Sequence, residues 1–234
     1  EASRNNRDAV AVGGTYRFDG VFASPPAVKP AMPGSRIGLD EVDPGRIRQA
    51  SSSVDEVQAR RRSVRRYAAE PVSRASIGEF LWRVCRTTGY IESSRQDIIS
   101  RPYPAGGSIN ELEFYLAVRR CSGLDPAVYH YDSHGHALVR LAGSERIAGK
   151  IVGRSGTAMG LAEGDQKPDV TVVIASRLPR LAWKYEGMAY RASLMNAGVV
   201  FHLMYMVATD MGLAPCANGT GDSRLLQEVA GLDR

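Results

Sequence analysis

Five arginines fall within seven residues of one short segment, which reads Arg60-Arg61-Arg62-Ser63-Val64-Arg65-Arg66-Tyr67. Guanidinium groups match phosphate oxygens with paired hydrogen bonds, and a serine hydroxyl adds a further donor. A solvated basic face or a nucleic-acid contact would have the same composition. Because Val64 and Tyr67 interrupt the charges with side chains that favour burial, we interpret the segment as a structured anion site. No recognised nucleic-acid-binding motif accompanies it, so we expect no nucleic acid as a partner.

A second candidate ligand site is a loop that carries two adjacent glycines just before an expected strand. It reads Arg101-Pro102-Tyr103-Pro104-Ala105-Gly106-Gly107-Ser108. Paired glycines let backbone amides approach a flat or anionic ligand closely. The alternative is an ordinary Pro-Gly turn. The loop is neither a Walker phosphate loop, since the lysine and hydroxyl pair of that motif does not follow the second glycine, nor a Rossmann fingerprint.

Few other side chains form a pattern that is typical of catalysis. Lys184 is a candidate general base if burial or a cationic neighbour such as Arg180 favours its neutral form, although most lysines lie at the surface. His202 is expected to be a core histidine of a long helix, while His134 and His136 fall in an expected exposed turn. No cluster has the spacing of zinc ligands, so the sequence predicts no metal.

The composition is that of an ordinary globular protein. Of 234 residues, 44% are hydrophobic and 24% are charged, and the net charge of +5 permits an anionic ligand. Three widely separated cysteines, Cys85, Cys121 and Cys216, argue against a disulfide framework and for a reducing, cytoplasmic location. The near-apolar run 197–208 is shorter than the ~20 residues of a membrane-spanning helix, so no membrane contact is expected. The sequence begins without a methionine, so residues upstream are expected.

The elements that must position these residues divide the chain into two expected parts. Residues 1–50 carry weak periodicity and a proline-rich stretch at 25–33, which predicts an extended arm. Such an arm either wraps a partner subunit or is a poorly ordered terminus. Residues 51–234 carry the regular periodicity of a folded domain.

Helices are expected at five places in this domain. A capping box at Ser53 and Glu56 begins the first, which runs into the arginines. The second spans 73–88, with a capping box at Ser76 and Glu79 and a left-handed cap at Gly89. The others span 144–152, 187–211 and 223–230. The helix 187–211 is apolar nearly all round, which predicts a place in the centre of the fold or at a subunit interface.

Strands are expected between these helices. Aromatic and β-branched residues predict strands at 112–118 and 128–131, and a turn at 133–135 leads into a third strand at 137–141. The run 170–175 is apolar on both faces and predicts a fully buried strand. Because helices and strands mix without a strict βαβ rhythm, we expect an α+β fold.

Four segments in the same order resemble the nitroreductase superfamily, and within it the SagB-type dehydrogenases. Arg61-Arg62-Ser63-Val64-Arg65 with Tyr67 is similar to the family's R-R-S-x-R segment, and residues 101–113 are similar to its R-P-x-P-S-G-G loop with a closing glutamate. Lys184-Tyr185, Tyr190-Arg191 and Asn196-Ala197-Gly198 resemble the K-Y-x(4)-Y-R-x(5)-G helix of the azoline dehydrogenases. Residues 211–216 resemble the closing G-L-x-P-C segment.

The resemblance implies an antiparallel-rich mixed sheet flanked by helices, in an entwined homodimer with a long central interface helix and two sites for flavin mononucleotide (FMN). It assigns the flavin to three segments of the chain. The implied FMN-binding residues are Arg61, Arg62, Ser63, Arg65, Pro104, Ala105, Gly106, Gly107, Ser108, Pro215, Cys216, Ala217 and Gly219. Cys216 is expected to line the flavin pocket and not to act as a nucleophile.

The implied reaction is the oxidation of a thiazoline or oxazoline ring in a peptide to the aromatic azole, with Lys184 and Tyr185 as the catalytic residues. The expected partners are an azoline-containing peptide, made by a ribosome or by a nonribosomal synthetase, and the cyclodehydratase or synthetase that supplies it. Two alternatives stay open. One is an NAD(P)H-dependent nitro- or quinone reductase of the same fold, and the other is a non-catalytic subunit of a biosynthetic complex.

The chain departs from the pattern at three places. Ala105 stands where the loop usually has serine, which removes one side-chain hydrogen bond to the flavin. Ile109-Asn110-Glu111 replaces Leu-Tyr-Pro, so the substrate side of the loop is expected to differ. The sequence also ends before the final strand and helix that the resemblance implies, so a phosphate ligand is expected to be missing with that tail.

Overall fold

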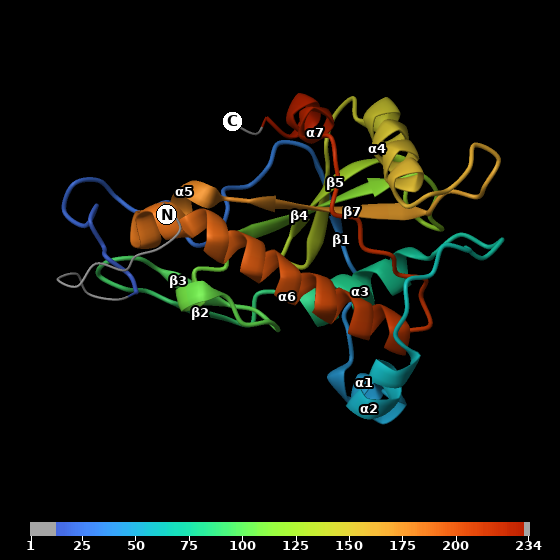
Figure 1. Ribbon diagram of the computed structural model, residues 1–234, viewed down its shortest axis with the longest axis horizontal. Helices are drawn as coiled ribbons and strands as arrows, with labels where there is room; N and C mark the ends of the chain where they lie inside the picture. Colours follow the sequence, from blue (N-terminus) through green and yellow to red (C-terminus); the bar gives the residue numbers. More distant parts are fainter. Residues whose placement is uncertain (1–12, 232–234) are drawn as a thin grey trace.

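A five-stranded antiparallel sheet forms the centre of the fold (Figure 1). The computed structural model describes residues 13–231. The strands lie in the order β1-β6-β5-β4-β7, and each neighbouring pair is antiparallel. Their bounds are β1 Ser35–Gly38, β4 Leu112–Val118, β5 Ala127–Asp132, β6 Ala137–Arg140 and β7 Val170–Ser176. The expected α+β class is confirmed.

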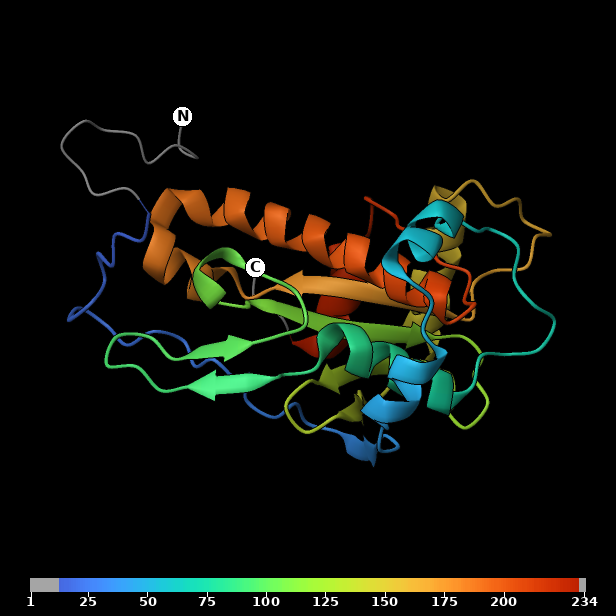
Figure 2. The ribbon, with the colours of Figure 1, turned by 90° about the horizontal axis from the view of Figure 1, so that it is seen from below.

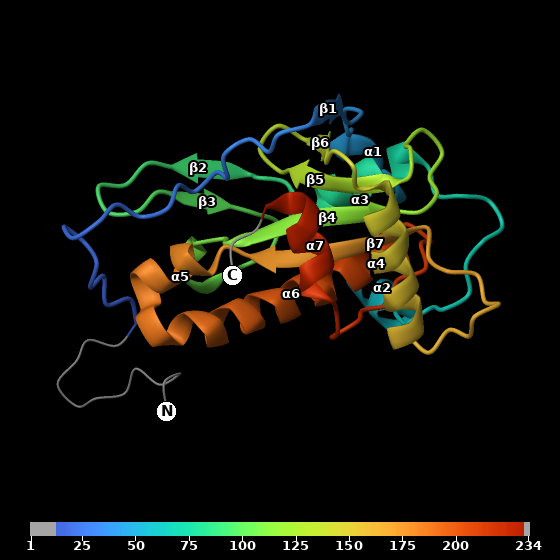
Figure 3. The same ribbon diagram turned by 90° about the horizontal axis from the view of Figure 1, so that it is seen from above.

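Helices cover both faces of this sheet. Helices α3 (Arg74–Cys85) and α6 (Ala189–Asp210) pack on one face, and α4 (Glu145–Ala158) and α7 (Ser223–Ala230) pack on the other (Figure 3). Strand β4, which lies between β5 and β7, is buried on both faces, because its alternate side chains join the two core clusters. The remaining elements are α1 (Pro44–Ala50), α2 (Val54–Arg60), α5 (Leu178–Tyr185) and a hairpin of β2 (Gly89–Ile91) and β3 (Ile98–Ser100).

Elements with strong local signals form as the sequence predicts. The capping box at Ser53 is present, with the Ser53 hydroxyl accepting from the Glu56 amide, and β4 and α7 have the expected bounds. Helix α6 ends before Gly212, which has a φ of 69°, and the Leu213 amide donates to the Ala208 carbonyl at 2.8 Å. This is the Schellman type of helix end.

Helix α3 differs from its expectation at both ends. Its N-cap is Ser73, whose hydroxyl accepts from the Ser76 amide, so the box expected at Ser76 and Glu79 does not form. The helix ends at Cys85, and Gly89 is the first residue of β2 and not a left-handed cap. The prediction was wrong because the pairing of β2 with β3, which is not encoded locally, competes with the last helical turn.

Two further predictions need correction. Helix α4 extends to Ala158, past the expected end at 152, since packing of the buried Gly156 offsets the low helix propensity of the glycines there. Strand β7, expected to be fully buried, is only half-buried in the chain because it is the edge strand of the sheet.

The first fifty residues, expected as an extended arm, contain regular structure. β1 pairs with β6 at the far edge of the sheet, and α1 begins after the N-cap Asp43. Residues 13–34 form turns and irregular structure, with neither helix nor strand. They lie along α5 and the β2–β3 hairpin, where Trp183 Nε1 donates to the Phe22 carbonyl at 3.0 Å. Residues 1–12 of the expected arm lie outside the described residues.

One helical run, Leu178–Asp210, is long and apolar enough to cross a membrane by length and composition alone. The sequence prediction counted only residues 197–208 and was wrong on this point. The same test is passed by core helices, and α6 contributes Val200 and Val207 to the main core cluster. The packing therefore places one face of α6 in the core, and its remaining surface forms one outer side of the molecule (Figure 2).

Candidate active site

The arginine segment crosses the C-terminal end of α6 and meets the expected closing segment there. The Val64 amide donates to the Pro215 carbonyl at 2.8 Å. The Ser63 hydroxyl lies 2.7 Å from the Tyr205 hydroxyl, which also accepts from the Ala217 amide at 2.8 Å. Two segments that are far apart in sequence are therefore joined through Tyr205. The sequence pattern placed Tyr205 in the apolar stripe of the long helix and did not predict this role. The hydroxyl group of Tyr205 could have indicated a polar contact at this position.

Among residues 13–231, no arginine of this segment forms an ion pair with a carboxylate. Arg61 stacks over the Tyr205 ring, with Cζ 5.4 Å from the centroid, and Arg65 Nε donates to the Met159 carbonyl at 2.9 Å. Arg62 is exposed and has no hydrogen bond or ion pair within that range. Guanidinium groups held near a structured backbone without a carboxylate partner are suited to bind a phosphate.

A cavity of about 2270 Å³ lies beside this segment and follows β7. Arg62 and the whole run from Pro215 to Asp222 border it, so the expected residues Pro215, Cys216, Ala217 and Gly219 all line the cavity. Its volume exceeds the 300–1,000 Å³ that is typical of a small-ligand pocket, because it is open and includes the free edge of the sheet. The glycine loop and Lys184 do not border it.

The glycine loop has an unusual backbone. Gly107, Ser108 and Asn110 have φ values of 58°, 57° and 49°, which is the left-handed region. Non-glycine residues in that region store strain and cluster at functional sites. Gly107 is required for a second reason, because a Cβ atom there would collide with the Tyr185 hydroxyl and lie 2.6 Å from Lys184 Nζ.

The expected catalytic pair therefore meets the expected flavin loop within one chain. Lys184 and Tyr185 are the last residues of α5, which stops because Glu186 adopts a φ of 47°. Lys184 Nζ donates to the Gly107 carbonyl at 3.3 Å, and the Tyr185 hydroxyl approaches the same glycine. An ammonium group and a phenol converge on one point of the loop.

The loop residues 109–111, which replace the expected Leu-Tyr-Pro, are buried in the protein. Ile109 and Glu111 have no exposed surface and Asn110 is 3% exposed, so the expectation of a changed substrate side is corrected. Asn110 Nδ2 donates to the Ile99 carbonyl, which ties the loop to β3. These residues anchor the loop from beneath.

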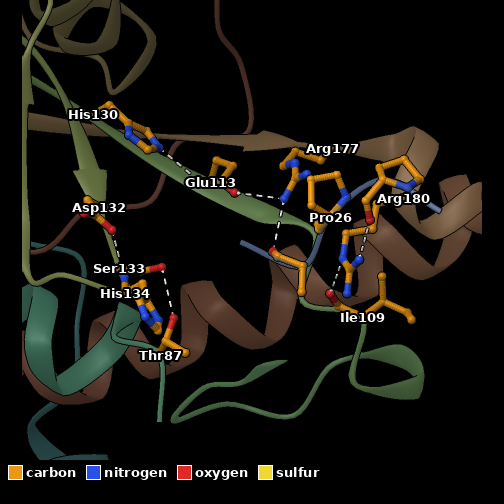
Figure 4. A network of polar contacts seen from close by, with 12 residues as sticks. Pro26, Thr87, Ile109, Glu113, His130, Asp132, Ser133, His134, Arg177 and Arg180 are labelled. Atoms are coloured by element: carbon orange, nitrogen blue, oxygen red, sulfur yellow. Dashed lines mark hydrogen bonds and ion pairs between the residues drawn. The ribbon is translucent and has the colours of Figure 1, made fainter. Parts of the chain in front are cut away.

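Arg180 and Arg177 of the α5 region complete this anchor (Figure 4). Arg180 is fully buried, and it donates to the carbonyls of Ile109 at 3.0 Å and Pro25 at 2.7 Å as well as to that of Asp97. Burial lowers the pKa of Arg180 to about 10, and the nearby Arg177 acts in the same direction. The sequence analysis suggested Arg180 as a cation that influences Lys184. In the structure its guanidinium group instead donates hydrogen bonds to three backbone carbonyls.

Arg177 joins the sheet to the residues before β1. It donates to the carbonyls of Pro26 at 2.7 Å and Ala27 at 3.1 Å, and it lies 3.7 Å from the Glu113 carboxylate (Figure 4). Glu113 Oε2 is 3.0 Å from His130 Nε2, and both side chains are buried. The glutamate that closes the expected loop motif is therefore part of a buried polar network.

The residues of the expected site form two sets that contact α6 at different points along the helix. The arginine set meets the helix at Tyr205, and the glycine-loop set meets it at Asn196, whose Oδ1 accepts from the Gly106 amide at 3.0 Å. Nine residues of helix separate these contacts by roughly 13 Å. Between and beside them α6 exposes apolar side chains, and His202, expected in the core, is exposed.

Comparison with known proteins identifies the family. The model of the nitroreductase family matches residues 59–234. A protein of Methanocaldococcus jannaschii named as a nitroreductase, MJ1384, is 24% identical over 176 residues, which cover 75% of this chain and 83% of that protein.

Two solved structures share the fold. A protein of Ralstonia eutropha JMP134 named as a nitroreductase superimposes with a TM-score of 0.64 at 18% identity, over 91% of this chain and 92% of the other. A chain of the E. coli microcin synthetase McbBCD complex with truncated pro-MccB17 bound superimposes with a TM-score of 0.57 at 21% identity, over 99% of this chain and 80% of the other. With a family model that spans most of its length, this chain belongs to the nitroreductase family.

Proposed function

We propose that this protein is an FMN-dependent dehydrogenase that oxidises thiazoline or oxazoline rings of a peptide to the aromatic azoles. The observation that carries the proposal is the convergence of Lys184 Nζ and the Tyr185 hydroxyl on Gly107. Family membership makes the protein an oxidoreductase by class, and members of the family generally bind a flavin, commonly FMN. The choice of azolines rests on the lysine and tyrosine pair and their place before the long helix.

The residues present fit FMN in chemistry. Arg61, Arg62 and Ser63 offer donors for a phosphate and have no carboxylate partners within the described chain. Gly107 adopts the left-handed turn of the expected flavin loop, and the absence of a side chain there leaves the space that Lys184 and Tyr185 occupy. Pro215 and Cys216 would line the flavin at the end of α6.

The protein would contribute position and proton transfer. FMN, when bound, supplies the two-electron chemistry by accepting a hydride from one ring carbon. Lys184 Nζ, in its neutral amine form, would take the proton from the adjacent ring atom and become an ammonium group, so that the azoline loses one hydride and one proton and becomes the azole. The Tyr185 hydroxyl would hold the ring nitrogen or share the proton. General-base assistance of this kind contributes ~10²–10⁴ in rate.

A peptide substrate and a biosynthetic partner fit the same proposal. One structural neighbour is a chain of a synthetase complex with truncated pro-MccB17 bound. By analogy, we infer that a cyclodehydratase or synthetase delivers the azoline peptide to this protein, in the cytoplasm. We also infer a homodimer, because pairing through the exposed face of α6 would bring the arginine set of one copy to the glycine-loop set of the other.

The test begins with the absorption spectrum of the purified protein and the mass of any chromophore released by heat. We expect flavin bands and the mass of FMN. Lys184→Ala should stay yellow and lose at least about a hundredfold in turnover of a thiazoline peptide. Lys150→Ala, at an exposed position of α4, is the matched control and should keep full activity. A Lys184→Ala variant with normal turnover would show that this lysine is not the base.

The alternative of an NAD(P)H-dependent nitro- or quinone reductase is favoured by the name of the M. jannaschii relative. Rapid reduction of the flavin by NADPH without any peptide would support it. A colourless protein that takes up no added FMN would instead support the non-catalytic subunit.

A further inference from the structure

Glu111 carries a buried carboxylate that the proposed chemistry does not use. It has no exposed surface, although it stands just before β4, where its backbone carbonyl accepts from the Arg177 amide at 2.9 Å. Burying a carboxylate is costly unless it is hydrogen-bonded, so its partners indicate its role. Both carboxylate oxygens accept from Asn196 Nδ2, at 3.1 and 3.0 Å, and within residues 13–231 no other group donates to them.

Asn196 transmits this contact to the glycine loop. A carboxylate can only accept hydrogen bonds, so Glu111 fixes the amide group of Asn196 with its nitrogen inward and its oxygen outward. That oxygen accepts from the Gly106 amide at 3.0 Å. Asn196 is 5% exposed and lies in the middle of α6, a rigid support for the contact.

The contact reaches the candidate catalytic residue in one further step. Gly106 is followed by Gly107, whose carbonyl accepts from Lys184 Nζ at 3.3 Å. Because Gly107 and Ser108 are held in the left-handed region, the loop needs an external restraint to keep this shape. The restraint at Gly106 is a charge-oriented hydrogen bond from α6.

We propose that Glu111 and Asn196 form a positioning pair that fixes the Gly106–Gly107 turn and, through the Gly107 carbonyl, the ammonium group of Lys184. The role of Lys184 in this statement rests on the proposed function. A pair of apolar residues would bury the same volume at a lower desolvation cost, so a buried carboxylate here is better explained by orientation than by stability. In the SagB-type loop that residues 101–113 resemble, proline stands at this position, whereas Glu111 supplies an acceptor here.

The test exchanges the two partners. Asn196→Asp alone places two carboxylates against each other in a buried site, and we expect their repulsion to displace the side chain at position 196 from the Gly106 amide. Glu111→Gln combined with Asn196→Asp restores the arrangement in reverse, since the new glutamine can donate to the new aspartate, which still accepts from the Gly106 amide. Ser193→Ala is the matched control, because Ser193 is a buried residue of the same helix whose hydroxyl bonds to Ser176 and not to the loop.

Two readouts are measured. The first is the hydrogen-exchange rate of the Gly106 amide in the protein without added FMN. It should rise about tenfold or more in Asn196→Asp, as for the loss of one strong hydrogen bond, and return to within about twofold in the double variant. The second is turnover of a thiazoline peptide at saturating FMN, where kcat should fall about tenfold and recover in the double variant, with little change in KM.

The outcomes separate the two proposals. An unchanged Gly106 exchange rate in Asn196→Asp overturns the positioning pair, even if the wild-type protein is an active dehydrogenase. Faster exchange with unchanged kcat reduces the pair to a structural contact and also overturns it. A wild-type protein that binds no FMN overturns the proposed function, while the exchange readout still tests the loop. If Asn196→Asp does not fold, Glu111→Gln alone must raise the exchange rate.

Discussion

Gly106 and Gly107 are neighbours, but an added Cβ atom would meet different surroundings at the two positions. A Cβ at Gly106 would make ordinary contact with Ala192 Cβ at 3.8 Å, whereas one at Gly107 would collide with the Tyr185 hydroxyl. Gly107 also has a φ of 58°, which costs an alanine roughly 1–2 kcal/mol. The colliding groups are the ends of flexible side chains, so the collision moves the catalytic pair more than it unfolds the protein.

We therefore predict that Gly107→Ala lowers turnover about a hundredfold or more while reducing the free energy of unfolding by only about 1–2 kcal/mol. Gly149→Ala, at an exposed position of α4 where a Cβ would meet nothing within 4 Å, should leave turnover within about twofold of the wild type. Steady-state kinetics and urea denaturation of both variants are the measurements. Equal losses of activity in the two variants would contradict the convergence of Lys184 and Tyr185 on Gly107.

Arg61 supplies a second prediction for a single residue. Its guanidinium is stacked on Tyr205 and is free to bond a phosphate. Since a hydrogen bond to a charged group contributes about 1.5–3 kcal/mol, Arg61→Ala should weaken FMN binding by roughly one to two powers of ten. Fluorescence titration measures it. Arg146→Ala, at an exposed position of α4, is the control, and equal affinity in both variants would move the phosphate site elsewhere.

Among the elements, the end of α6 is held by Asp210, the last residue of the helix. Its carboxylate accepts from Arg83 Nη2 of α3 at 2.5 Å and from the Ser52 amide before α2 at 2.9 Å. Burial alone would raise the pKa of Asp210, but the hydrogen bonds from Arg83, Ser52 and Ser51 outweigh it and hold the pKa below its ordinary value of 3.8. The contribution to stability is thus present above pH 3.8 and is lost as the pH falls through the lower folded-state pKa.

Asp210→Asn should therefore destabilise the protein by about 1.5–3 kcal/mol at pH 7, and the difference from the wild type should shrink below pH 3.8. Urea denaturation at pH 7, 5 and 3 measures it. Glu41→Gln removes an exposed carboxylate as a control and should change little at any of these pH values. A difference that stayed constant down to pH 3 would mean that Asp210 is not the titrating group.

Sequence patterns predicted the elements whose signals are local. The start of α2 at the Ser53 capping box and the bounds of the amphipathic α7 are determined by a few neighbouring residues. β1, β2 and β3 were missed because each is three or four residues long and exists only through its partner strand. The half-burial of β7 depends on the strand order, which no single segment encodes.

The candidate site was predictable as a set of residues but not as a geometry. Motif order identified the arginine segment, the glycine loop and the pair Lys184 and Tyr185, and the structure brings the pair to the loop. The inward direction of Glu111 could not be read from sequence, because an acidic residue in a loop is usually exposed. The joining role of Tyr205 depends on the path of the chain back across α6.

At the scale of the whole molecule, the uncovered side of α6 is the feature that most needs an explanation. Tyr190, Leu194, Met195 and Val199 are 65, 57, 61 and 38% exposed and follow one face of the helix, which forms an outer side of the molecule (Figures 2 and 3). A contiguous exposed apolar face of this kind marks an interaction surface. The two sets of site residues flank it and are roughly 13 Å apart on one chain.

If a second copy covers this face and completes the flavin site, a substitution that prevents dimerisation must also prevent FMN binding. We predict that Met195→Glu combined with Val199→Glu produces a monomer that retains no FMN, although neither side chain borders the cavity or belongs to the expected flavin site. Light scattering with size-exclusion chromatography gives the oligomeric state, and absorbance gives the flavin content. Ile91→Glu places the same charge at an apolar position of β2 that is 57% exposed, and it should leave both unchanged. A monomer that binds FMN as tightly as the wild type would mean that one chain holds the complete site, and the arginine segment and the glycine loop would then not share a ligand across two copies.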